Sequence, residues 1–109
     1  MKLGLFYVYD KENEVAISPL IPVRSFLDAG IGFSECYIKE KDIKKNPYNY
    51  KKLQLVQFAQ VESNDKGMRI LNSDIVEKTG EEVYNFVLQE MKDRNIDDYF
   101  VDDVVTPEV

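Results

Sequence analysis

The sequence has no histidine and only one cysteine, Cys36, among its 109 residues. The absence of histidine excludes Ser-His-Asp and Cys-His nucleophiles and the zinc motifs that use histidine. A single cysteine cannot form a disulfide within the chain. Only carboxylates, Lys and Tyr remain as acids and bases, and no spacing pairs them. We therefore expect a protein that is not an enzyme and that holds no metal and no other cofactor.

The sequence also lacks long apolar runs. None approaches the ~20 residues that cross a bilayer. Residues 1–10 do not show the charged region, apolar stretch and cleavage site of an export signal. We therefore expect a soluble protein with no membrane contact and a cytoplasmic location, with which a lone thiol is consistent.

What the sequence does contain is enough for one globular core. Hydrophobic residues make up 44% of the chain and aromatic residues 12%, which is typical of a globular protein rather than a disordered one. A chain of this length needs no metal or disulfide to stabilise its fold. We predict a single α+β domain over residues 1–95, followed by an acidic tail over residues 96–109.

Several segments have the apolar composition of strands, namely residues 2–9, 15–17, 35–39, 52–61 and 68–71. Residues 63–67 have turn chemistry, so the last two strands are predicted to pair as an antiparallel hairpin. An edge strand such as residues 68–71 is also a candidate seam for a homodimer, because exposed edges tend to be paired or protected.

The first strand alternates between two sets of side chains. Leu3, Leu5, Tyr7 and Tyr9 share one face, and Gly4, Phe6 and Val8 share the other. We expect both faces to be at least partly covered.

Two helices are predicted. The first runs over residues 22–29, with a proline in its first turn, and Gly30 and Gly32 are expected to stop it. The second runs over residues 79–94 and begins with the Thr-Gly-Glu-Glu spacing of a capping box. One further helical turn is expected at residues 40–45. Together these elements predict a small, mainly antiparallel sheet with two packed helices.

The charges are unevenly distributed. The chain has 14 basic and 20 acidic residues and a net charge of -6. Residues 39–52 carry six lysines against two acids, whereas residues 90–109 carry seven acids against two bases. A basic segment inside an acidic protein can hold a polyanion locally, or it can be neutralised by the acidic end of the same chain.

The basic segment interleaves lysines with tyrosines. A single-stranded nucleic acid needs cations along its phosphates and flat side chains on which unpaired bases stack. We therefore predict a site for single-stranded DNA in which lysines follow phosphates and tyrosines stack on bases: Lys39, Lys41, Lys44, Lys45, Tyr48, Tyr50, Lys51 and Lys52. The alternative is a solvated connector whose tyrosines pack on the core.

The acidic tail has alternatives as well. It can be a mobile or docked solubilising tail, or it can imitate nucleic acid and occupy the basic groove of a host or phage protein. In the second case the partner-binding residues are Asp97, Asp98, Tyr99, Phe100, Asp102 and Asp103. Adjacent carboxylates point apart and no EF-hand loop is present, so metal binding is not expected here.

Cys36 is predicted to be a buried structural residue. No histidine is present to lower the pKa of its thiol, and Phe33 and Tyr37 are its near neighbours in sequence.

The order of several short motifs resembles a known family. These motifs are Phe6-Tyr7-Val8-Tyr9-Asp10-Lys11, the return through Ser18 and Pro19, Arg24-Ser25-Phe26, Asn46-Pro47-Tyr48-Asn49-Tyr50 followed by Leu53 and Leu55, and Asp65-Lys66-Gly67-Met68-Arg69-Ile70. In this order they resemble the small nonstructural proteins of gokushovirus-type microviruses, which are single-stranded DNA phages. The resemblance covers roughly residues 2–72. The chain departs from the family at Val56-Gln57-Phe58-Ala59-Gln60 and at the additional pair Lys51-Lys52.

The resemblance implies an accessory protein that is not part of the virion and has no established catalytic activity. It would act on or near phage DNA during genome replication or packaging, in the host cytoplasm. This implication is consistent with the site predicted from the lysines and tyrosines.

Overall fold

The computed structural model describes residues 1–39, 48–97 and 99–100. Within these residues the chain forms an antiparallel sheet of six strands and two α-helices, which confirms the predicted α+β class. The strands are β1 (Lys2–Asp10), β2 (Val15–Ala16), β3 (Ile21–Val23), β4 (Leu53–Asn64), β5 (Gly67–Asn72) and β6 (Val76–Thr79). The helices are α1 (Phe26–Phe33) and α2 (Gly80–Asp93), with a π-helical segment (Ser34–Ile38) and a 3₁₀ turn (Tyr50–Lys52).

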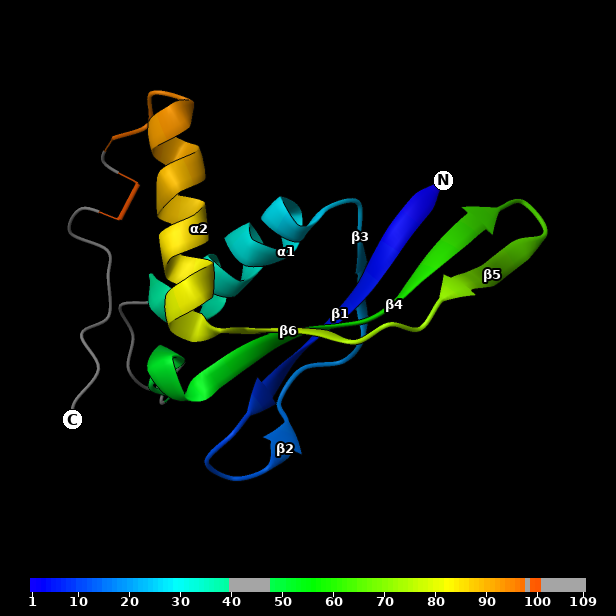
Figure 1. The fold of residues 1–109 in the computed structure, drawn as a ribbon, viewed down its shortest axis with the longest axis horizontal. Coiled ribbons are helices and arrows are strands. Elements are labelled where there is room, and N and C mark those ends of the chain that lie inside the picture. Colours follow the sequence, from blue (N-terminus) through cyan, green and yellow to red (C-terminus); the bar gives the residue numbers. More distant parts are fainter. Residues whose placement is uncertain (40–47, 98, 101–109) are drawn as a thin grey trace.

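Strands β1 and β4 form the centre of the sheet. They pair antiparallel from Lys2↔Glu62 to Asp10↔Leu53, with one bulge between these ends. The short strands β2 and β3 pair with the other edge of β1, and β5 and β6 pair with the other edge of β4. Both helices lie on the same side of this sheet (Figure 1).

The main core lies between the sheet and the helices. Phe6 and Val8 are alternate residues of β1 and point into it, as the period of a strand requires. They pack with buried residues of β4 and of the two helices, namely Leu53, Leu55, Ala29, Phe33, Val83, Val87 and Met91.

Two local predictions are confirmed. Strands β4 and β5 form the expected hairpin, with Asn64 paired to Gly67. Helix α2 begins with a capping box in which the Thr79 hydroxyl accepts from the Glu82 N–H and the Glu82 carboxylate accepts from the Thr79 N–H, each at 3.1 Å. The hydrogen bond from the Thr79 N–H favours the charged carboxylate and is the main reason why the pKa of Glu82 is lowered.

The prediction for the first helix is wrong at both ends. Pro22 lies in the edge strand β3, opposite Leu5 of β1, and helix α1 begins at Phe26. The Ser25 side chain caps this helix by accepting from the Asp28 N–H at 3.1 Å.

The two glycines do not stop the helix. Gly30 and Gly32 both lie inside α1, and Gly30 is buried where α1 crosses α2. A Cβ on Gly30 would lie 2.9 Å from Cγ2 of Val87. The glycine is therefore explained by the close approach of the two helices, and not by the end of a helix.

The strand predicted at residues 35–39 is also wrong. The chain continues from α1 directly into the π-helical segment Ser34–Ile38. Cys36 lies in this segment and is exposed, which corrects the prediction that it is buried.

Strands β3 and β6 were not predicted. They have three and four residues, too few to show a period, and each exists because a longer strand pairs with it. The helical turn predicted at residues 40–45 lies outside the described residues. Among the described residues, neither helix combines the length and the apolar character that a bilayer crossing requires.

The two glycines of α1 allow a matched test of helix packing. A Cβ on Gly32 would meet no atom within 4 Å, so Gly32→Ala is expected to stabilise the protein by about 0.5–1 kcal/mol through helix propensity. Gly30→Ala forces a contact with Val87 and is expected to destabilise it by about 1 kcal/mol or more. Urea unfolding of both variants measures the difference, and equal effects would contradict this account of Gly30.

Candidate nucleic-acid interface

Lys39 belongs to a small polar cluster at the end of the π-helical segment. Its Nζ atom lies 3.4 Å from Oε1 of Glu35 and 3.9 Å from the centroid of the Tyr99 ring. Its side chain is only 16% exposed. Lys39 therefore has a structural role in this conformation. Three other predicted lysines, Lys41, Lys44 and Lys45, lie outside the described residues.

Lys51 and Lys52 are exposed and make ion pairs across the surface. Nζ of Lys51 lies 3.5 Å from Glu81, and Nζ of Lys52 lies 3.3 Å from Glu12. All four side chains are about half exposed, and pairs of this kind contribute about 0–1 kcal/mol. A phosphate can therefore replace either carboxylate at small cost.

Lys11 joins these two lysines from the turn between β1 and β2. Its N–H donates to the carbonyl of Lys52 at 3.1 Å, and it lines a shallow hollow with Glu12, Lys51 and Lys52. We call Lys11, Lys51 and Lys52 the basic corner. Lys11 was not among the predicted residues, because in sequence it lies far from the other two.

A buried aspartate holds the turn that carries Lys11. The carboxylate of Asp10 accepts from the N–H groups of Glu12 and Asn13 and from the side-chain amide of Asn13, the last at 2.7 Å. The hydrogen bond from that amide is the main reason why the pKa of Asp10 lies below its usual value. The turn is therefore a rigid support for the basic corner.

Of the two predicted tyrosines, Tyr50 does not present an open ring. Tyr50 is 8% exposed and stacks on Tyr84, with centroids 5.9 Å apart and planes 22° apart. Burial also raises the pKa of Tyr50. Tyr48 is half-buried and meets Tyr37 edge-on. The prediction that Tyr50 stacks on a base is therefore corrected, because its ring packs on the core.

The part of the tail that the structure describes is docked. The Tyr99 hydroxyl donates to Oε1 of Glu35 at 2.7 Å, and Phe100 is buried and stacks on Tyr84 at 4.5 Å between centroids. Burial, followed by the bond to Glu35, raises the pKa of Tyr99. Of the predicted aspartates, Asp97 is exposed. The other three, Asp98, Asp102 and Asp103, lie outside the described residues.

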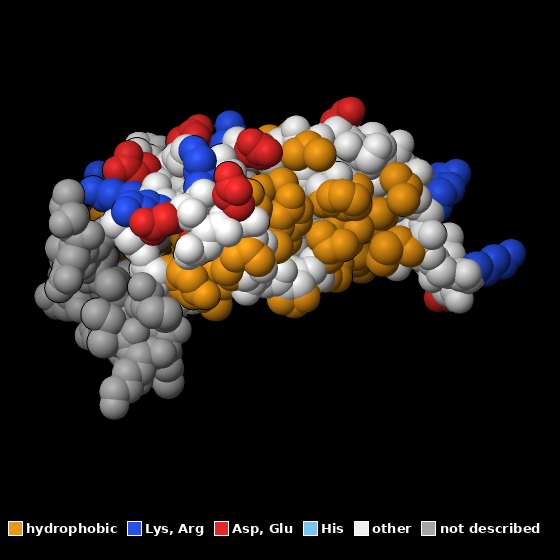
Figure 2. Space-filling view, turned by 90° about the horizontal axis from the view of Figure 1, so that it is seen from below, with side chains coloured by type: hydrophobic (Ala, Val, Ile, Leu, Met, Phe, Trp, Pro, Cys, Tyr) orange, Lys and Arg blue, Asp and Glu red, His pale blue; other side chains and the backbone are white. Residues whose placement is uncertain are grey.

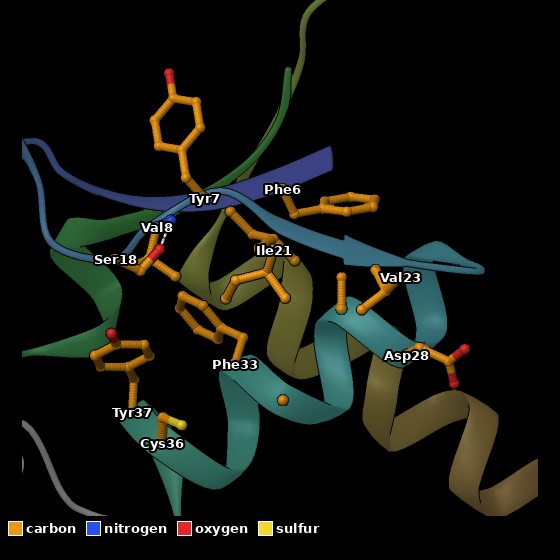
Figure 3. Close-up of a pocket in the computed structure, with 13 residues that line it drawn as sticks. Phe6, Tyr7, Val8, Ser18, Ile21, Val23, Asp28, Phe33, Cys36 and Tyr37 are labelled. Carbon is orange, nitrogen blue, oxygen red and sulfur yellow. Dashed lines mark hydrogen bonds between the residues drawn. The ribbon is translucent and has the colours of Figure 1, made fainter. Parts of the chain in front are cut away.

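The face of the sheet that points away from the helices is largely apolar. Figure 2 shows hydrophobic side chains gathered across this face. Tyr7 and Tyr9 of β1 belong to it, and the ring of Tyr7 points away from α1 (Figure 3). Neither α-helix lies over this face (Figure 1). The side chains of Leu3, Leu5, Tyr7 and Tyr9 are nevertheless partly buried, which confirms the prediction that both faces of this strand are at least partly covered.

A bulge adds a third ring to this open face. Gln57 pairs with Phe6 and Ala59 pairs with Leu5, so Phe58 is the extra residue of β4. Bulges often redirect a side chain in this way. Phe58 is 41% exposed and lines a shallow hollow with Tyr7, Tyr9, Ala16, Ser18 and Leu20. We call Tyr7, Tyr9 and Phe58 the aromatic face.

The aromatic face and the basic corner adjoin each other. Tyr9 is followed two residues later by Lys11 in sequence. On the neighbouring strand, Tyr9 pairs with Gln54, and β4 begins directly after Lys52. Both lysines therefore lie just beyond the end of the row of rings. This juxtaposition offers flat apolar surfaces next to cations, which suits a ligand with both bases and phosphates.

Within the part of the chain that the structure describes, no group of three or more Cys, Asp or Glu side chains is placed to hold a metal ion. The arrangement offers apolar surfaces beside charged groups.

Comparisons of the chain with protein-family models, with curated proteins and with solved structures give no match. The resemblance to gokushovirus-type proteins therefore stays a prediction, and the interpretation of the interface depends on its geometry.

The docking of Phe100 can be tested directly. Phe100→Ala removes a buried ring from its stack on Tyr84 and is expected to destabilise the protein by about 3 kcal/mol. Ile96→Ala is the control, because Ile96 is exposed and its truncation should change stability by about 0.5 kcal/mol or less. Equal shifts in urea unfolding would contradict the docking of the tail.

Proposed function

We propose that the protein is a noncatalytic binder of single-stranded DNA. Bases would stack on the aromatic face while phosphates meet the basic corner. The observation that carries this proposal is that Tyr9, on the sheet face away from the helices, lies next to Lys11 and opposite the start of β4, which follows Lys52. Phe58 lies further along the same face, in the hollow that Tyr7 and Tyr9 also line.

The geometry of the aromatic face suits unpaired bases. Tyr7 and Tyr9 are two residues apart on one strand, which separates them by about 7 Å along the strand. This separation is about twice the 3.4 Å rise of stacked bases. Neighbouring rings therefore match bases that have been spread apart, as in a single strand, and not the closed stack of a duplex.

Further lysines are supplied by the segment that precedes Tyr48. Tyr48 lines a hollow together with Lys52, Asp10 and Asn13. Lys41, Lys44 and Lys45 precede Tyr48 in sequence and lie outside the described residues. Their three charges would extend the phosphate contacts, as the sequence predicts.

The biological setting remains the one that the resemblance implies. We propose an accessory protein of a single-stranded DNA phage that acts during genome replication or packaging in the host cytoplasm. The alternative, a protein-binding inhibitor that uses its acidic tail, gains no specific support, because Tyr99 and Phe100 pack on the chain's own core.

The aromatic face is tested by removing rings while keeping apolar bulk. Phe58→Leu and Tyr9→Leu should each weaken binding of a labelled oligothymidine by about 5- to 150-fold, since one stacked base contributes ~1–3 kcal/mol. Fluorescence anisotropy at low salt measures the affinity. Ile75→Leu is the matched control, because Ile75 is exposed but does not line the hollow. The proposal fails if the three variants bind alike or if a duplex binds as tightly as the single strand.

The basic corner is tested through salt dependence. Affinity should fall steeply with salt, and Lys11→Gln or Lys52→Gln should reduce the slope by ~0.7 for each lost phosphate contact. Lys66→Gln carries the same charge change at the tip of the β4–β5 hairpin, at the other end of β4, and should leave the slope unchanged. The combined change of Lys44, Lys45, Lys51 and Lys52 to Gln should abolish most binding, and unaltered binding would overturn the assignment.

A further inference from the structure

An apolar cavity lies on the helix side of the sheet, between β3 and α1 (Figure 3). Its volume is about 150 Å³. Phe6, Phe33 and Leu55 of the main core line it, and Ile21 and Val23 approach from β3. Phe6 points toward the helices and the ring of Tyr7 points away from α1 (Figure 3), although Tyr7 and Ser18 line both this cavity and the hollow beside the aromatic face.

A glycine without a packing role lies at this cavity. Gly32 is in the last turn of α1, is exposed and lines the cavity. A glycine inside a helix is unfavourable relative to alanine, and at Gly30 the contact with Val87 explains it. At Gly32 a Cβ would meet no atom within 4 Å. Because Gly32 has no side chain, the space beside the cavity stays open.

The residues that line the cavity favour an apolar ligand. The hydroxyl of Ser18 already accepts from the Val8 N–H at 2.8 Å and donates to the Pro19 carbonyl at 3.0 Å. The carboxylate of Asp28 points away from the other residues labelled in Figure 3. A water molecule needs two to four polar partners. Ser18 and Asp28 do not offer them, and most of the other residues that line the cavity are apolar. The space therefore favours an apolar group over water.

We propose that this cavity binds a small apolar molecule that carries a single aromatic ring. Dry apolar cavities of about 150 Å³ take up benzene. Phe33 and Tyr37 line the cavity with centroids 5.4 Å apart, and aromatic side chains favour edge-to-face contact with a further ring. The exposed thiol of Cys36 also lines the cavity. This site differs from the proposed contact with DNA, because its ring contacts come from Phe33 and Tyr37 and not from the aromatic face.

The test uses toluene as the probe. Toluene should bind the full chain saturably, with one site, and should shift the methyl resonances of Ile21 and Val23 in NMR spectra. Gly32→Leu places a side chain in the open space and should weaken this binding at least tenfold. Asn85→Leu is the matched control, because it adds the same exposed leucine to α2 away from the cavity and should bind toluene as the parent does. Absence of saturable binding, or equal binding by Gly32→Leu, would overturn the proposal.

A second measurement does not depend on the folding of a variant. Attaching a benzyl group to Cys36 through a disulfide should block toluene, because the ring can reach the cavity, whereas a hydroxyethyl group should leave toluene binding intact. Equal effects of the two groups would contradict the site. The capped amino acid N-acetyl-phenylalanine amide should bind at least tenfold more weakly than toluene. If the capped amino acid bound as tightly as toluene, the cavity would be a site for an aromatic side chain of another protein. That result would overturn the proposal that it binds a small molecule.

Discussion

The pairing of β1 with β4 is the constraint on which the rest of the molecule depends. Its register sends Phe6 and Val8 to the helices and Tyr7 and Tyr9 to the open face. Because side chains alternate along a strand, a slip of one residue would exchange the two sets. The helices would then face phenol groups, and the core would lose its largest apolar contacts. The burial of Phe6 therefore fixes the position of the aromatic face.

Packing of the core alone does not explain the apolar side chains on the sheet face away from the helices. Phe58 lies at the one bulge of the β1–β4 pair and is 41% exposed. An extended apolar patch on a monomer is typical of an interaction surface. In the proposed complex, bases would stack on uncharged rings, and the stacking itself does not depend on the sign of the protein's charge. The lysines would be needed where the phosphates pass, because the net charge of the chain is -6.

The sequence correctly predicted the elements that are stabilised by contacts between residues close in sequence. The prediction failed where the stabilising contact joins residues far apart in sequence. The capping box at Thr79 and the hairpin turn before Gly67 involve residues a few positions apart, and both were predicted. Gly30 was taken as a helix stop because its partner, Val87, is remote in sequence and close only after folding. Tyr50 was assigned to DNA for the same reason, since its partner Tyr84 lies on α2. Tyr7 and Tyr9 were placed on one face by their alternation, but only the helix positions show that this face is open.

The glutamates that pair with the basic corner, Glu81 and Glu12, affect which ligands can bind there. The pairs Lys51–Glu81 and Lys52–Glu12 are solvent-exposed, and such pairs contribute about 0–1 kcal/mol. They are too weak to exclude a phosphate, whose binding also releases counterions from the DNA. They do reduce the attraction for polyanions that offer charge alone. In the proposed complex, a ligand would gain affinity at this corner by also placing bases on the adjoining rings, and the acidic partners would then favour single strands over duplexes.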